Sequence, residues 1–192
     1  GQLSGFSPSV WQSDTATAKN AWCHCTTNRY KTAAEIAAVM ADVISKNGVF
    51  VLNIGPYADG RLHEKDVEIL TALGKWTKQN AAALFSSSPY KLFGEGRRHK
   101  AESFGDSLKY TSRDIRYTYK PCHVYAFVLK PHSKGIYKLK SLRADRDEFG
   151  FVIKGVSANG QPLKWRQTSK ALIIEKPGTA DTMPVVFDIE ID

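Results

Sequence analysis

The spacing of hydrophobic residues changes from helical to alternating near the middle of the chain. In 32–46, one apolar stripe recurs at i, i+3, i+4, i+7 and i+8 behind a capping box of Thr32 and Glu35. Lys46-Asn47-Gly48 then supplies a cation and a left-handed cap, which predicts the end of this helix. A second helical pattern covers 64–82, and its expected apolar face consists of Val67, Leu70, Leu73, Trp76 and Thr77.

A short strand and a polar loop are predicted between these helices. The run 49–54 is continuously apolar until Asn53, as in parallel strands that are buried on both faces. After it, Pro56 cannot extend a strand, and Asp59-Gly60 favours a turn. Ligands of α/β proteins bind at the carboxyl ends of strands, so 53–60 is a candidate site, with an ordinary strand-to-helix turn as the alternative. One parallel strand cannot bury two helices, so we expect part of a larger α/β sheet or barrel.

The second half alternates with a period of two. Val124–Leu129 is a candidate central strand, and Asn159-Gly160 predicts a hairpin turn between 151–156 and 163–167. In the last strand, Val185, Phe187, Ile189 and Ile191 fall on one face. About seven or eight short strands are typical of an antiparallel sandwich, and we place the boundary at 86–89.

The charge of the chain favours no particular partner. The formal net charge is +8, and residues 97–192 carry 18 Lys and Arg against 11 Asp and Glu. Only Arg97-Arg98-His99-Lys100 forms a cluster, and no nucleic-acid-binding motif accompanies it, so we expect no nucleic acid partner. An anion-binding role for this cluster is kept as an alternative function.

Metal and membrane sites are not expected either. Three cysteines do not make a disulfide framework, and Cys23-His24-Cys25 lacks a second pair at zinc-ligand spacing. No stretch approaches the roughly 18 apolar residues of a membrane span. No signal peptide is visible, and because the chain starts without Met at Gly1, we expect it to be part of a longer chain.

Several motifs, in this order, resemble a known family. They are Trp11–Thr15, Asn20-Ala21-Trp22, Asp42–Gly48, Leu52–Pro56 with Asp59-Gly60, Gly74-Lys75-Trp76, Asn80, Gly94–Gly96, Asp114–Thr118 and Tyr125–Leu129. Together they resemble the retaining α-L-fucosidases of glycoside hydrolase family 29. The combined string from 42 to 60 is the most specific part, and the likeness fades after about residue 145.

The resemblance implies a fold, a reaction and a partner. Residues 1–88 would be the last βα units of a (β/α)8-type barrel, and 89–192 a C-terminal antiparallel β-sandwich. The enzyme would remove terminal fucose from glycans without a metal or cofactor, using a nucleophile Asp and an acid/base Glu that lie upstream of Gly1. The N-terminal part of the same enzyme would then be the partner of this chain. A secreted, periplasmic or lysosomal location would follow from the family.

The resemblance also implies substrate-binding residues. Trp22 would pack against the fucose ring and its methyl group, with a purely structural place in the core as the alternative, and His24 and Trp11 would complete the set. Asp14 is interpreted as a structural residue that bonds turn backbone. Relatives usually have Trp-Gly-Tyr at 22–24 and Asn-Gly-Glu at 80–82, where this chain has Trp-Cys-His and Asn-Ala-Ala. These departures leave a non-catalytic sugar-binding or structural module as the alternative function.

Overall fold

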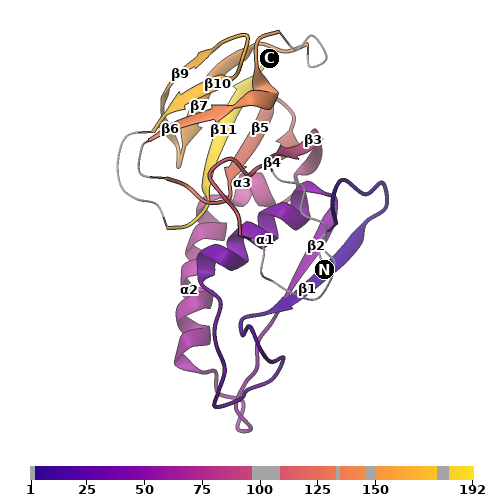
Figure 1. Ribbon diagram of the computed structural model, residues 1–192, viewed down its shortest axis with the longest axis vertical. Coiled ribbons are helices and arrows are strands. Elements are labelled where there is room, and N and C mark those ends of the chain that lie inside the picture. Colours follow the sequence, from indigo (N-terminus) through magenta and orange to yellow (C-terminus); the bar gives the residue numbers. More distant parts are fainter. Residues whose placement is uncertain (1–2, 97–108, 133–134, 146–149, 177–181) are drawn as a thin grey trace.

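The chain folds into an α/β part followed by an all-β part. The computed structural model describes residues 3–96, 109–132, 135–145, 150–176 and 182–192. The helices and a small parallel sheet come first, and two antiparallel sheets follow (Figure 1). The cluster at 97–100 lies outside the described residues. Within the described part, no helix is long and apolar enough to cross a bilayer.

The parallel sheet consists of β1 (Trp11–Ala16) and β2 (Gly48–Asn53), paired from Trp11↔Gly48 to Ala16↔Asn53. The expectation of a single parallel strand was therefore wrong. The sequence of β1 hides its strand character because the inward positions are Ser13 and Thr15, which are buried although they are polar. Asp14 lies within this strand on its exposed face, not in a turn.

The open face of β2 corrects a second expectation. Phe50 and Leu52 pack against the helical core, but Val49 and Val51 are 49% and 39% exposed. Among the described residues, β2 pairs with β1 alone. A strand that is apolar on both sides therefore packs on only one side among the described residues, and its opposite side is exposed.

Helix α1 (Ala33–Ser45) begins and ends as predicted. The capping box of Thr32 and Glu35 is confirmed. The left-handed residue within Lys46-Asn47-Gly48 is Asn47, with φ of 69°. Gly48 is required for space, because a Cβ there would lie 2.6 Å from Val43 Cγ1 and 2.8 Å from Trp11 Cε2.

Helix α2 (Glu64–Gln79) is followed by the short α3 (Ala81–Leu84), and its buried face differs from the expected one. Ile69, Leu73 and Trp76 are buried, whereas Val67 is 48% exposed. Leu73 and Trp76 are thus buried as expected, and the Trp76 ring lies 6.4 Å from that of Phe127 in the larger antiparallel sheet.

The two antiparallel sheets contain nine strands among the described residues, slightly more than predicted. The larger sheet has the order β3 (Ser88–Glu95), β4 (Ile115–Lys120), β5 (His123–Val128), β11 (Val185–Ile191), β7 (Ile153–Ala158), β8 (Gln161–Pro162). The smaller sheet has the order β6 (Ile136–Leu139), β10 (Leu172–Glu175), β9 (Lys164–Gln167). A 3-10 turn, η1 (Lys140–Leu142), follows β6.

The predicted details of these sheets are largely confirmed. β5 is central, and the four apolar residues of β11 are buried as expected. The Asn159-Gly160 hairpin is present, with φ of 50° and 73° at its two central residues, and it joins β7 to β8. The chain then crosses to the smaller sheet as β9. Side chains of both sheets share one core, so they lie face to face.

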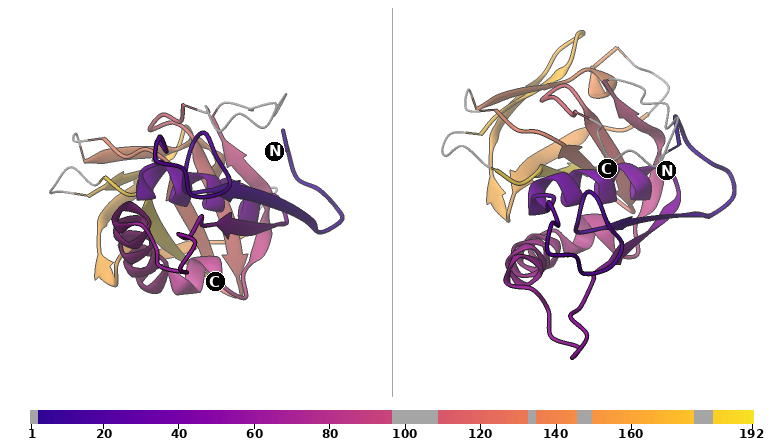
Figure 2. Two further views of the ribbon diagram at one scale, coloured as in Figure 1. Left: turned by 90° about the horizontal axis from the view of Figure 1, so that it is seen from below. Right: turned by 60° about the horizontal axis from the view of Figure 1, so that its bottom comes forward.

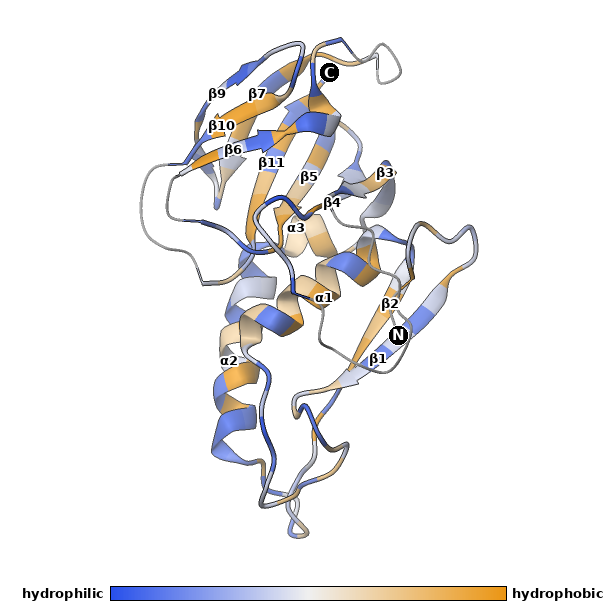
Figure 3. Ribbon diagram, in the orientation of Figure 1, coloured by the Kyte–Doolittle hydropathy of each residue, from blue (hydrophilic) through white to orange (hydrophobic). Residues whose placement is uncertain are grey.

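The larger sheet has a second buried face, which the helices cover. Tyr125, Phe127 and Val186 share a core with residues of α1, α2 and α3. The helices thus lie between the parallel pair and the larger sheet (Figure 1 and Figure 2). In Figure 3, β5 and β11 are largely hydrophobic, whereas β9 is largely hydrophilic. Phe127 of β5 is fully buried in the core that the larger sheet shares with these helices.

A buried ionic network crosses the same boundary. Asp42 of α1 accepts hydrogen bonds from Arg116 Nε of β4 at 2.5 Å and from Lys46 Nζ at 2.7 Å. Lys46 Nζ also donates to the carbonyl oxygen of Leu3 at 2.7 Å. Burial lowers the pKa of Lys46, and the adjacent Asp42 offsets part of that effect. One carboxylate thus holds two buried cations together.

Candidate functional site

The carboxyl ends of β1 and β2 meet at one edge and carry two loops, 17–32 and 54–63. The Thr17 N–H donates to the Asn53 carbonyl at 3.1 Å, which continues the strand pairing by one residue. Lys31 is buried and donates from Nζ to the carbonyls of Ala16 at 2.6 Å and Ala18 at 3.0 Å. Both ends of the first loop are therefore fixed to the end of β1.

Asn53 and Gly55 attach the two loops to each other. Asn53 Nδ2 donates to the carbonyl oxygen of Trp22 at 2.6 Å. A Cβ at Gly55 would lie 2.5 Å from both Cys23 C and His24 N, so only glycine lets the second loop contact the backbone of the first. Asn53 and Gly55 therefore position the segment 22–24, in addition to ending the strand.

A cluster of aromatic and histidine rings lies next to this contact. The His24 ring is 4.2 Å from Tyr57 and 6.1 Å from His63, and the His63 ring is 5.3 Å from Tyr30. We call His24, Tyr30, Tyr57 and His63 the ring cluster. Among the described residues, His24 Nδ1 is buried without a hydrogen-bond partner. The cluster thus joins residues of both loops and the start of α2.

Hydrogen bonds hold the members of the ring cluster and their neighbours in place. His63 caps α2, and its Nδ1 accepts from the Lys65 N–H at 3.1 Å. Thr17 donates to the buried Asp66 carboxylate. Burial raises the pKa of Tyr30, and the nearby Asp66 carboxylate raises it further, so Tyr30 stays a neutral hydroxyl.

The structure brings two of the three predicted site residues together. Trp22 and His24 lie at the carboxyl edge, and Trp22 is 52% exposed, so it does not belong to either core. Trp11 lies at the opposite end of β1, where its Nε1 donates to the Lys46 carbonyl at 2.9 Å. Sequence reasoning missed Tyr30, Tyr57 and His63. Tyr57 and His63 could have been found from their position in the loop 54–63, which follows β2.

The chemistry available from the described residues is binding by rings and polar groups. No three His, Cys, Asp or Glu side chains of the described chain come close enough to share a metal ion. Cys23 and Cys25 are exposed thiols, and a hydrogen bond from Thr27 lowers the pKa of Cys25. An exposed indole beside polar loops suits a sugar, which has apolar C–H faces between its hydroxyls.

Two family models match the chain in succession. The model described as alpha-L-fucosidase matches residues 2–82, and the model described as alpha-L-fucosidase C-terminal domain matches residues 108–190. Between them they cover most of the α/β part and most of the all-β part.

Individual relatives agree with these models. The chain is 31% identical to the tissue alpha-L-fucosidase of Macaca fascicularis over 108 residues, which are 56% of this chain and 20% of that protein. It is 28% identical to the plasma alpha-L-fucosidase of Pongo abelii over 151 residues, or 77% of this chain and 29% of that protein. The chain therefore spans less than a third of the length of these relatives.

Solved structures share its fold. An alpha-fucosidase of Thermotoga maritima in complex with fucose superposes with a TM-score of 0.74 at 18% identity, covering 98% of this chain and 41% of that one. Isoenzyme 1 of Paenibacillus thiaminolyticus gives a TM-score of 0.72 at 20% identity, with 95% and 40% covered. At such identities the likeness concerns the fold alone.

Proposed function

Because this chain belongs to the α-L-fucosidase family, we propose that the protein containing it is a retaining hydrolase that removes terminal α-L-fucose from glycans. The observation that carries this proposal is the succession of two fucosidase family models along the chain. The position of Trp22 supports it, since Asn53 holds the backbone carbonyl of Trp22 at the carboxyl edge of parallel strands while the indole stays exposed. This edge is where ligands of α/β proteins bind.

In the proposed reaction, two carboxylates upstream of this chain do the bond breaking. An Asp attacks the anomeric carbon, and a Glu protonates the leaving oxygen and later activates water. The residues of this chain bind and orient. Trp22 covers the apolar face and methyl group of fucose, where each buried methyl contributes on the order of 0.8 kcal/mol. His24, whose ring lies 4.2 Å from that of Tyr57, lines the rim on the side of the leaving group.

The proposal assigns each part of the fold a place in the complete enzyme. β1, β2 and the helices form the last βα units of a (β/α)8-type barrel. The exposed face of β2 at Val49 and Val51 is covered by earlier barrel strands from the N-terminal part of the enzyme. The two antiparallel sheets, which share one core, form a C-terminal β-sandwich that supports the barrel helices from behind.

Hydrolysis of an aryl α-L-fucoside tests this function in two preparations. The complete protein is expected to release the aryl group, whereas residues 1–192 alone should not, because the loss of both carboxylates removes orders of magnitude of rate. Turnover by residues 1–192 that is abolished by changing a carboxylate within them would refute the assignment. Fucose binding by the complete protein without turnover would instead establish the non-catalytic sugar-binding module.

A further inference from the structure

The dipeptide Asn-Gly occurs twice in the chain, at Asn47-Gly48 and at Asn159-Gly160. In this dipeptide, the backbone nitrogen of the glycine can attack the side-chain amide carbon of the asparagine, because glycine has no Cβ to hinder the approach. The two copies have the same covalent chemistry. Any difference in their reactivity therefore comes from the fold around them.

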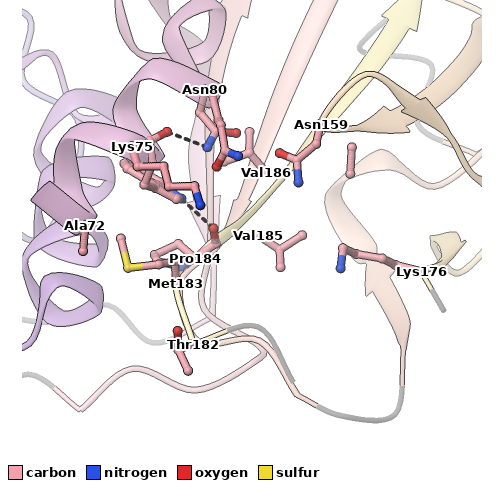
Figure 4. A pocket seen from close by; sticks show the side chains of 13 residues that line it. Ala72, Lys75, Asn80, Asn159, Lys176, Thr182, Met183, Pro184, Val185 and Val186 are labelled. Atoms are coloured by element: carbon pink, nitrogen blue, oxygen red, sulfur yellow. Dashed lines mark hydrogen bonds between the residues drawn. The ribbon is translucent and has the colours of Figure 1, made fainter. Parts of the chain in front are cut away.

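Asn159 lies at the tip of the β7–β8 hairpin, and both Asn159 and Gly160 are exposed. The Asn159 side chain lines a cavity between the carboxyl half of α2 and the larger antiparallel sheet (Figure 4). Among the described residues drawn in Figure 4, none forms a hydrogen bond with the Asn159 amide. These neighbours therefore do not hold the amide group away from the backbone of Gly160, and water reaches it.

The reaction requires the backbone of the hairpin tip to rotate, and little structure opposes this rotation. β8 has only two residues and lies at the end of the six-stranded sheet, where it forms the pairs Ala158↔Gln161 and Ser157↔Pro162 with β7. Pro162 has no N–H to donate to this pairing. Gln161 and Pro162 are exposed, so opening the tip uncovers neither of them from a core. Such an edge opens locally at a small fraction of the free energy of global unfolding.

Asn47-Gly48 is held much more firmly. The Asn47 side chain donates from Nδ2 to the carbonyl oxygen of Ser7 at 3.1 Å, and the Asn47 N–H donates to the carbonyl oxygen of Ile44 at 3.1 Å. Gly48 is paired with Trp11 as the first residue of β2, and a Cβ at Gly48 would lie 2.8 Å from Trp11 Cε2. Rotation of this peptide would therefore disturb the end of α1 and the pairing of β1 with β2.

We propose that Asn159 is a site of spontaneous deamidation in the folded protein, whereas the fold protects Asn47. When the hairpin tip opens, the Gly160 nitrogen forms a bond to Asn159 Cγ and gives up its proton, and the amide NH2 group leaves with a proton as ammonia. Water then hydrolyses one of the two C–N bonds of the cyclic imide. The products are aspartate and isoaspartate, in which the backbone runs through Cβ. Either product places a carboxylate at the cavity wall, and neither depends on the proposed hydrolase activity.

Incubation of the intact protein at pH 7 and pH 9, followed by proteolysis in mild acid and mass spectrometry, tests the proposal. Aspartate and isoaspartate should form at Asn159 about tenfold faster than at Asn47, or more, because only the hairpin tip opens readily. The rate at Asn159 should rise with pH, since the attacking nitrogen must lose its proton. Asn159→Asp is the matched control, because Asp-Gly also favours this turn but carries no amide, so the early release of ammonia should be lost.

The same incubation in guanidinium chloride, which unfolds the chain, separates the effect of the fold from that of the sequence. Both Asn-Gly pairs should then react at similar rates, and the reaction at Asn47 should accelerate more. Three outcomes would overturn the proposal: Asn47 reacts as fast as Asn159 in the folded protein, Asn159 reacts only after unfolding, or Asn159→Asp releases ammonia as fast as the unaltered protein. Thermal unfolding shows whether the variant keeps its fold, and the comparison of Asn159 with Asn47 in the unaltered protein needs no variant.

Discussion

Single residues determine how Trp22 is presented. The Asn53 amide holds the Trp22 carbonyl at 2.6 Å, so the backbone of the loop is fixed while the indole stays exposed. Asn53 could be recognised in the sequence as a polar residue that ends an apolar strand. Its partner, the Trp22 carbonyl, could not be predicted from the sequence, because a hydrogen bond between residues 31 positions apart leaves no local pattern.

Replacing Trp22 by Ala in the complete protein should weaken fucose binding about tenfold or more, equivalent to ~1.4 kcal/mol. The reason is the loss of the apolar surface beneath the sugar. The melting temperature should change little, because the indole is 52% exposed. Titration with fucose and thermal unfolding measure the two effects. Trp22→Phe, which keeps a ring, is the control, and a large loss of stability with unaltered affinity would place Trp22 in a core instead.

Tyr117 makes the stability of the chain sensitive to alkaline pH. Its hydroxyl is buried and donates to Glu95, which also accepts from the Lys140 N–H at 3.0 Å. Burial raises the pKa of Tyr117 well above its usual range, and the Glu95 charge adds to this effect. The unfolded chain therefore releases this proton near pH 10, whereas the folded chain retains it, so stability is lost as the pH rises.

Urea unfolding at pH 8, 10 and 11 checks this effect. Between pH 10 and 11, the unaltered protein should lose ~1 kcal/mol more than Tyr117→Phe does. Tyr119→Phe is the comparison, because Tyr119 is only partly buried and belongs to the same strand. Equal pH dependence of the unaltered protein and the Tyr117→Phe variant would show that Tyr117 does not titrate differently on folding.

The helices, strands and turns that were predicted correctly are those whose sequence signals are local. The Thr32–Glu35 capping box, the Asn159-Gly160 hairpin and the alternation in β11 all lie within a few residues, and all three are present. β1 was missed because its inward positions are Ser13 and Thr15, whose polar side chains look like loop residues until their neighbours are known. In α2, Leu73 and Trp76 are buried as predicted, whereas Val67 is exposed and Ile69 is buried instead.

The contact between the two site loops predicts the effect of replacing Gly55. Gly55→Ala should destabilise the protein by roughly 1–3 kcal/mol and displace the segment 22–24, because its Cβ would lie 2.5 Å from backbone atoms of that segment. Thermal unfolding and fucose titration measure both consequences. Gly74→Ala is the matched control, since nothing lies within 4 Å of a Cβ at that position in α2. Equal stability of the two variants would contradict the proposed contact.

Buried side chains, including the charged Arg116, connect the α/β part to the all-β part. Arg116 and Tyr117 are neighbours in β4 and lie on opposite faces of the sheet, yet both are buried because helices cover the second face. A charged residue at an alternating position normally predicts a solvent-exposed face. Only the tertiary arrangement, in which Asp42 meets Arg116 from 74 residues away, explains its burial.

Asp42→Ala should therefore be among the most destabilising single changes, with a loss of about 3–5 kcal/mol, because it leaves Arg116 and Lys46 buried without their shared carboxylate. Lys46→Met should cost clearly less, since the Asp42–Arg116 pair remains and the side-chain volume is similar. Denaturant unfolding of both variants gives the comparison. If Lys46→Met were the more harmful change, Asp42 would not be the centre of the network.

The helices pack against both the parallel pair and the larger antiparallel sheet, and this shared packing determines how the chain unfolds. Ile36 and Trp76 belong to the same core as Phe127, so we expect the parts on either side of 86–89 to unfold together. Amide protons of α1 and β5 should then exchange with solvent at similar rates in one cooperative opening, rather than in two steps. By the same reasoning, a protease that nicks the backbone at Ser87 should leave two pieces that elute together. The two pieces should stay together after the backbone is cut, because α1 and α2 pack on the larger antiparallel sheet.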